Sequence, residues 1–336
     1  MDVNRTFIIA EVGSTHDGSM GNAKCAVEVS AECGADAVKF QVHIATAETL
    51  RNAPMPSYFK GEPRFEYFDR TGFTREQWLE LKAFSEERSM TFLSSPFSTE
   101  AVELLESIDI ERYKIPSGEV TNLPYLERIA QTGKPVILSS GMSSWDELDT
   151  AVATITELHH NLTVLQCTTE YPCPPENVGL NVMLEMKDRW GLPVGFSDHT
   201  LSNAAALAAV TMGASVVEKH ITLSKRMYGS DARHSAEPDQ FADLVSQIRE
   251  IENIQSSPVD KSDVSKFADM KEIFQKSIVS QVGIPEGTII TKEMLGIKKP
   301  GTGLPPVHLT EIVGKRVIRT IPMDTILHQT DIDWGS

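Results

Sequence analysis

Polar side chains stand at or just beyond the ends of seven of the eight short β-prone segments in the first 254 residues of this 336-residue chain. They include cations, carboxylates, hydroxyls and an amide, namely Glu11, Lys39, Gln41, Lys114, Ser117, Ser139, Thr169, Tyr171, His199 and His220. One such residue alone is usually a salt-bridge partner or a core residue, but so many together indicate a site. Lysines, hydroxyls and glycine-flanked turns, whose backbone N–H groups can face an anion, suit phosphate or carboxylate. The sequence therefore predicts a pocket for an anionic substrate.

Two histidines end successive β-prone segments, His199 in Ser197–Thr200 and His220 in Glu218–His220. Neutral imidazole nitrogen is a common ligand of divalent cations. Two histidines leave positions that carboxylate, water or substrate oxygen could fill, and such a site suits Mn²⁺ or Mg²⁺ better than a closed zinc site. Spacing alone also allows two hydrogen-bonded core histidines.

The elements that must position these residues alternate between β-prone runs and longer amphipathic stretches. The runs are Phe7–Val12, Ala37–Val42, Thr91–Leu93, Arg112–Ile115, Pro135–Leu138, Thr163–Cys167, Pro193–Phe196 and Ser215–His220. Apolar residues recur at helical spacing between them, as in Asn22–Glu32, Thr74–Arg88, Ser144–Leu158 and Ser202–Met212. Eight βα units, with no glycine-rich dinucleotide fingerprint after the first run, predict a closed (β/α)8 TIM barrel with its site at the carboxyl ends of the strands.

The remaining quarter of the chain has a different pattern. Residues 1–254 form the predicted barrel, and the polar stretch 255–275 is predicted as a linker that carries some helix. Residues 276–336 predict a small β-rich domain, with short β-prone runs at Ile278–Val282, Ile289–Thr291, Val317–Ile321 and Ile326–Gln329.

Composition limits the partners. A formal net charge of -16 argues against nucleic acid and against an anionic membrane surface, so an anionic substrate must meet a local cationic pocket. The four cysteines have no metal-ligand spacing and are expected to be free thiols. The N-terminus lacks a signal-peptide pattern and no apolar run reaches the ~20 residues that span a bilayer, which predicts a cytoplasmic protein.

A series of motifs points to one family. In chain order they are Ile8–Gly13 with His16 and Gly18, Val38–Gln41, Tyr113–Ile115 with Ser117–Glu119, Cys167–Thr168 with Tyr171–Pro172, Ser197–Thr200 and Glu218–His220. Over nearly its whole length the chain resembles the sialic acid synthase family, which makes N-acetylneuraminate and legionaminate-type nonulosonates. The segment Lys298–Gly303 is similar to that family's C-terminal antifreeze-like (SAF) domain.

This resemblance implies a reaction. Phosphoenolpyruvate would condense with the open-chain aldehyde of an N-acetylated amino sugar, either N-acetylmannosamine or a 2,4-diacetamido-trideoxy hexose. The products would be a nine-carbon 2-keto acid and phosphate. The reaction would require a divalent metal ion, Mn²⁺, Mg²⁺ or Co²⁺.

The resemblance also implies roles for individual residues. His199 and His220 match the metal ligands, and Lys39, Lys114 and Ser139 would bind phosphate and carboxylate. Glu11 would manage a proton or stabilise developing positive charge. Further substrate contacts are expected from Gln41, Ser117, Thr169, Tyr171, Asp231 and Lys299.

Two positions depart from the family pattern, Thr15 in place of an asparagine and Lys299 in place of an arginine. Lysine keeps the charge but loses the planar fork of arginine. The loop Arg226–Asp231 looks more like legionaminate synthases than like strict N-acetylmannosamine users. The resemblance further implies a domain-swapped homodimer, since an extended linker of about 20 residues reaches roughly 65 Å.

Two alternatives stay open. Lys114 or Lys39 could be the Schiff-base lysine of a metal-free aldolase, because a buried lysine can have a lowered pKa. In a non-enzymatic alternative, the C-terminal domain binds ice or a protein partner and the barrel is an inactive carrier.

Overall fold

The computed structural model describes residues 5–54 and 61–335. Two parts of the chain lie outside the described residues. They are residues 1–4, which belong to the N-terminal segment without a signal-peptide pattern, and residue 336 of the predicted C-terminal domain. The chain divides into two compact units, Met1–Ser257 and Pro258–Ser336, and each is described by itself.

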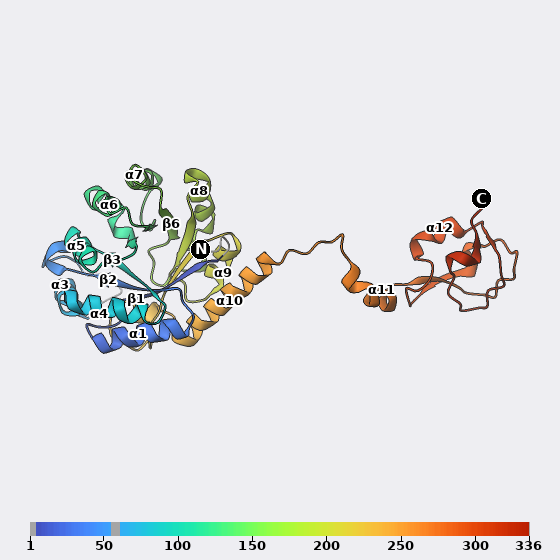
Figure 1. Ribbon diagram of the computed structural model, residues 1–336, viewed down its shortest axis with the longest axis horizontal. Coiled ribbons are helices and arrows are strands. Elements are labelled where there is room, and N and C mark those ends of the chain that lie inside the picture. The colour runs from blue at the N-terminus through green and yellow to red at the C-terminus, as the bar shows by residue number, and fades with distance from the viewer. Residues whose placement is uncertain (1–4, 55–60, 336) are drawn as a thin grey trace. The chain divides into compact units, whose positions relative to one another are not determined.

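The first unit is a closed barrel of eight parallel strands in sequential order, which confirms the predicted TIM barrel (Figure 1). The strands are β1 (Phe7–Gly13), β2 (Ala37–Val42), β3 (Thr91–Pro96), β4 (Tyr113–Ile115), β5 (Val136–Ser139), β6 (Leu162–Cys167), β7 (Val194–Asp198) and β8 (Val216–His220). The barrel closes between the first and last strands, where Glu11 of β1 is in register with His220 of β8 and with Lys39 of β2.

Helices surround the barrel (Figure 1). They are α1 (Met20–Glu32), α2 (Ala45–Glu48), α3 (Arg64–Thr71), α4 (Arg75–Glu86), α5 (Thr99–Ser107), α6 (Leu123–Ala130), α7 (Trp145–Thr156), α8 (Leu180–Trp190), α9 (Ala204–Thr211) and α10 (Pro238–Ser256). Capping boxes fix two of the helix starts, Thr74 with Gln77 at α4 and Ser144 with Glu147 at α7. Such a cap stabilises a helix by about 1 kcal/mol.

The barrel interior changes from apolar to polar within two residues. Buried side chains from six strands pack into one apolar layer made of Ile9, Ala37, Leu93, Ile137, Leu165 and Val216. Side chains alternate across a strand, so the residues two positions further along face inward as well. Those residues are Glu11, Lys39, Ser95, Ser139, Cys167 and Glu218. The alternation therefore places a polar layer on an apolar floor, at the carboxyl ends of the strands.

The second unit has its own small core of ten buried apolar residues, all of them isoleucine, leucine or valine. Its elements are α11 (Ala268–Phe274), β9 (Ser277–Ser280), β10 (Leu295–Lys298), α12 (Leu309–Ile312), β11 (Arg316–Val317) and β12 (Ile332–Asp333). They include two antiparallel pairs, β9 with β10 and β11 with β12.

The predicted elements of this part of the chain differ from the observed ones. The predicted runs at 289–291 and 326–329 form only isolated bridges, and β10 and β12 were not predicted. Helix α10 continues to Ser256, two residues into the predicted linker, and α11 lies within it.

Among the described residues, no helix combines the length and apolar character that crossing a bilayer requires.

Candidate active site

A pocket lies at the carboxyl ends of the barrel strands and is lined by nearly all the site residues predicted from the sequence. Its lining includes Glu11, Lys39, Gln41, Lys114, Ser117, Ser139, Thr169, Tyr171, His199, His220 and Asp231. The remaining candidate, Lys299, belongs to the second unit, where its Nζ atom lies 4.9 Å from the centre of the Phe274 ring. Eleven candidates scattered over 220 residues of sequence are thus gathered in one pocket.

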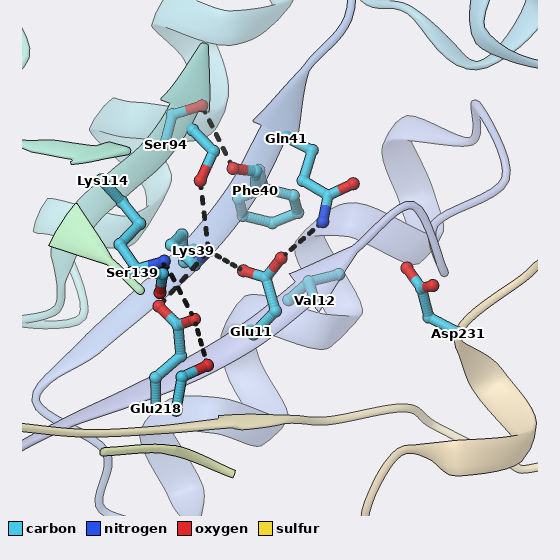
Figure 2. Close-up of polar contacts among 12 residues, drawn as sticks. Glu11, Val12, Lys39, Phe40, Gln41, Ser94, Lys114, Ser139, Glu218 and Asp231 are labelled. Atoms are coloured by element: carbon cyan, nitrogen blue, oxygen red, sulfur yellow. Dashed lines mark hydrogen bonds and ion pairs between the residues drawn. The ribbon is translucent and has the colours of Figure 1, made fainter. Parts of the chain in front are cut away.

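Two lysines and two glutamates form a buried ion-pair network on the floor of the pocket (Figure 2). Lys39 Nζ lies 3.1 Å from Glu11 Oε2 and 3.3 Å from Glu218 Oε2. Lys114 Nζ lies 3.4 Å from Glu218 Oε1 and donates a 2.7 Å hydrogen bond to Ser139 Oγ. All four charged side chains are buried. Burying charges is expensive even when they are paired, so such a network is better explained by function than by stability.

The environment shifts the pKa values of three members of this network. Burial by itself raises the pKa of Glu218, but Lys114 and Lys39 outweigh it and lower the value to about 2. Burial opposes protonation of Lys39, but Glu11 and Glu218 outweigh it and raise the pKa of the lysine. Burial lowers the pKa of Lys114, and the positive charge of Lys39 adds to this although Glu218 opposes it.

Hydroxyl groups surround the glycine-containing turn that follows β5. A Cβ atom added at Gly141 would collide with the hydroxyls of Thr169 and Ser117. Thr169 Oγ1 is buried and has no hydrogen-bond partner among the described residues. These hydroxyls, with Ser139 beside Lys114, can donate to the oxygens of a phosphate or carboxylate.

The two histidines lie side by side with a ring-centre distance of 5.6 Å, and Tyr171 lies against His199 at 4.2 Å. Next to them in sequence, Lys219 Nζ donates a 2.6 Å bond to Asp198 Oδ2 and also binds the Thr200 carbonyl. This buried pair fixes the ends of β7 and β8, and with them the separation of the two imidazoles.

Both imidazoles can offer a nitrogen lone pair. His199 Nδ1 lies 2.8 Å from the Thr168 carbonyl oxygen, which can only accept, so Nδ1 carries the proton and Nε2 remains available. Burial and then His220 lower the pKa of His199 to about 3, which keeps it neutral at pH 7. His220 Nδ1 is buried without a hydrogen-bond partner among the described residues.

These donors fit an open metal site of the kind Mn²⁺ or Mg²⁺ occupies, with water or substrate oxygens as the other ligands. Within residues 5–54 and 61–335, no group of three or more His, Cys, Asp or Glu side chains is arranged to hold a metal.

Comparison with known proteins gives the family. A profile of the NeuB family matches residues 26–260. The chain belongs to the NeuB family. A second profile, of the SAF domain, matches residues 275–333. The predicted family and the predicted antifreeze-like domain are thereby confirmed.

Named relatives of this NeuB-family chain are synthases of nine-carbon sugar acids. The N-acetylneuraminate-9-phosphate synthase of Homo sapiens is 37% identical over 97% of this chain and 92% of its own length. The N,N'-diacetyllegionaminic acid synthase of Campylobacter jejuni is 36% identical over 97% of this chain and 100% of its own length. The N-acetylneuraminic acid synthetase of Leptospira borgpetersenii, solved with citrate, superimposes with a TM-score of 0.69 at 30% identity, covering 80% of this chain and 91% of that chain.

Some residues of the NeuB-family pocket were not singled out from the sequence. Glu218 was noted only as a neighbour of His220, although its position two residues beyond inward-facing Val216 marks it as part of the polar layer. His43 and Arg64 also line the pocket. His43 follows Gln41 by two residues, a signal that strand alternation could have used. Arg64 comes from α3, between β2 and β3, and no spacing rule predicts its place.

Thr15, one of the two departures from the family pattern, is held by a local hydrogen bond. Thr15 is buried and donates a 2.8 Å hydrogen bond to the Val12 carbonyl, and it is not among the residues that line the pocket. Direct contact between its side chain and a sugar in the pocket is therefore not supported.

Proposed function

We propose that this NeuB-family protein condenses phosphoenolpyruvate with the open-chain form of an N-acetylated amino sugar. The products are a nine-carbon 2-keto acid and phosphate. The observation that carries the proposal is the buried network of Lys39, Lys114, Glu11 and Glu218, with the hydroxyls of Ser117 and Thr169 in the same pocket. Two lysines and a hydroxyl cradle suit the phosphate and carboxylate of one small ligand, and the carboxylates suit positive charge that develops on its carbon atoms.

The reaction places different demands on different residues. Carbon 3 of phosphoenolpyruvate attacks the aldehyde carbon, and its C=C π electrons form the new C–C bond. The C=O π bond of the aldehyde opens, its oxygen takes up a proton, and positive charge develops at carbon 2. Glu11 and Glu218 are the two carboxylates on the pocket floor, and their negative charges can stabilise that positive charge. Water then adds to carbon 2 and gives one proton to a carboxylate, which replaces the proton taken up by the aldehyde oxygen. The C–O bond to phosphate breaks, the hydroxyl at carbon 2 becomes the keto group, and its proton leaves with the phosphate. Lys39 and Lys114 hold the departing phosphate.

The proposal includes a divalent metal, Mn²⁺ or a similar ion, held by His199 and His220. When bound, the ion would polarise the aldehyde oxygen of the sugar. The protein side chains orient the sugar, and Tyr171, Asp231 and Gln41 are the pocket residues proposed to contact it.

The acceptor is proposed to be N-acetylmannosamine or a 2,4-diacetamido-trideoxy hexose. The relatives named above include synthases for a phosphorylated N-acetylneuraminate and for diacetyllegionaminic acid at nearly the same identity. The decisive assay measures phosphate release from phosphoenolpyruvate with Mn²⁺ and each candidate sugar, including N-acetylmannosamine 6-phosphate. We expect release with one class of sugar, and no release with any of them would contradict the proposed function.

A Schiff-base aldolase is the second candidate, because burial lowers the pKa of Lys114. Its hydrogen bond to Ser139 and its ion pair with Glu218 favour a charged binding group instead. As part of the same assay, borohydride is added in the presence of pyruvate. We expect no covalent labelling of Lys114 or Lys39, and labelling together with metal-free activity would favour the aldolase. The named synthase relatives weigh against the non-enzymatic alternative.

A homodimer in which the SAF domain of one chain serves the active site of its partner remains part of the proposal. Residues 258–267 precede α11 without forming an α-helix or strand, which is consistent with a connecting segment. We expect sedimentation equilibrium to give a dimer mass, with 37.1 kDa per chain. A fully active monomer would contradict this arrangement.

A further inference from the structure

His43, which no family motif or sequence expectation assigns, lies in the wall of the pocket between charged and polar groups. Its Nδ1 atom is 2.9 Å from both oxygens of the Glu48 carboxylate, and its Nε2 atom is 3.1 Å from Gln41 Oε1. The rings of Phe68 and Phe97 stack against it at 3.7 and 4.2 Å. The side chains of His43 and Glu48 are each 5% exposed. The imidazole is therefore fixed in orientation.

The orientation of the Gln41 amide follows from its other neighbour. Gln41 Nε2 donates a 2.8 Å hydrogen bond to Glu11 Oε1, and Figure 2 shows the amide nitrogen directed at Glu11. The opposite orientation would place the amide oxygen against a carboxylate oxygen, and both groups only accept. Gln41 Oε1 must therefore face His43.

Both nitrogens of His43 consequently face acceptors, the Glu48 carboxylate on one side and the Gln41 carbonyl on the other. A neutral imidazole has only one N–H, so beside an ionised Glu48 one of these contacts would place two lone pairs together. The imidazolium satisfies both contacts, and Glu48 balances its charge. Other charged groups nearby are Arg64, whose guanidinium lies 5.2 Å from the centre of the Phe68 ring, and Glu119, whose pKa is raised by burial and then by Glu48.

We propose that the His43–Glu48 pair fixes Gln41 as a hydrogen-bond donor for the acceptor sugar, which makes His43 a specificity-determining positioning residue. With its oxygen occupied by His43, Gln41 can offer the pocket only N–H. Gly13 leaves room beside it, because a Cβ there would lie 3.6 Å from Gln41 Nε2 and 2.5 Å from Asp231 Oδ2. The amide donor and the carboxylate acceptor thus border one space. That pairing suits an acetamido group, whose C=O accepts and whose N–H donates.

This inference rests on the proposed function, since it concerns the amino-sugar side of the same pocket. A double-mutant cycle tests it. His43→Phe keeps a ring between Phe68 and Phe97 but removes both N–H groups. We expect this change to raise the KM of the amino sugar about tenfold while the KM of phosphoenolpyruvate stays within twofold. On a Gln41→Met background the same change is expected to alter the sugar KM by less than twofold. Equal effects on both backgrounds would overturn the proposal.

A second measurement does not depend on activity. In the intact protein at pH 7.5, the side-chain ¹⁵N shifts of His43, assigned by their selective change in Glu48→Gln, should report two protonated ring nitrogens. Glu48→Gln, which removes the balancing charge, should leave one. A singly protonated ring in the wild type would overturn the proposal, even if His43→Phe does not fold. If no amino sugar supports phosphate release, the proposed function fails and the ¹⁵N shifts alone decide the state of His43.

Discussion

Replacing Lys39 by methionine is expected to lower kcat/KM for phosphoenolpyruvate roughly 100- to 1,000-fold, as the loss of one preorganised charge-binding group does in other enzymes. The same change should lower the free energy of unfolding by about 3 kcal/mol at pH 7. The reason is the position of Lys39 Nζ, 3.1 Å from Glu11 and 3.3 Å from Glu218. Methionine fills similar space but leaves two buried carboxylates without the cation between them.

The stability loss should depend on pH in a defined direction. The wild-type pKa of Glu218 is lowered to about 2 from 4.5, so its ion pairs stabilise the fold above pH 4.5 and cease to do so as the pH falls toward 2. Without Lys39, the folded-state pKa of Glu218 must rise. The difference in unfolding free energy between wild type and Lys39→Met should therefore be larger at pH 8 than at pH 4, as measured by urea denaturation.

Lys82→Met is the matched control. Lys82 pairs with Glu86 at 2.6 Å on the surface of α4, with 15% and 45% of the two side chains exposed. A partly exposed pair one helical turn apart contributes about 0.5 kcal/mol or less, so stability and kinetics should stay near those of the wild type. A Lys39→Met protein that is as stable and as active as Lys82→Met would show that the buried network has neither role.

The site could be predicted from sequence to the extent that strand periodicity determines it. Glu11, Lys39 and Ser139 each lie two positions beyond an inward-facing apolar residue of their strand, and a closed barrel brings such positions together toward one mouth. The fold of the barrel was predictable for the same reason. Strand limits were less so: β3 extends to Pro96, beyond the predicted Leu93, because Ser94 and Ser95 face buried polar partners rather than solvent.

What escaped prediction depends on contacts between segments far apart in the chain. The charge of His43 follows from Glu48 and Gln41 together, and no single residue indicates it. In the second unit, β11 and β12 have only two residues each, so the sequence contains no periodicity to detect. The buried Asp331, paired with Arg319 at 2.5 Å, fixes that region through a tertiary contact instead.

Removal of divalent metal by a chelator is expected to abolish phosphate release, and added Mn²⁺ should restore it. The physical basis is the pair of imidazoles of His199 and His220, whose ring centres lie 5.6 Å apart. His199 is neutral because burial lowers its pKa to about 3. His220 Nδ1 is buried and has no hydrogen-bond partner among the described residues. A lone pair left without a proton donor in a buried site is costly unless a ligand uses it. His199→Ala and His220→Ala should each lower Mn²⁺ affinity by at least tenfold, as measured by titration calorimetry.

The control for these variants is His160→Ala, which changes an exposed histidine in the turn between α7 and β6. It should bind Mn²⁺ like the wild type. Calorimetry separates metal binding from catalysis, because the affinity is read without turnover. Metal affinity that is lost in the two alanine variants, with the fold retained, would assign the ligands. Full activity in excess chelator would instead require His199 and His220 to act on the substrate directly, as hydrogen-bonding groups of the pocket.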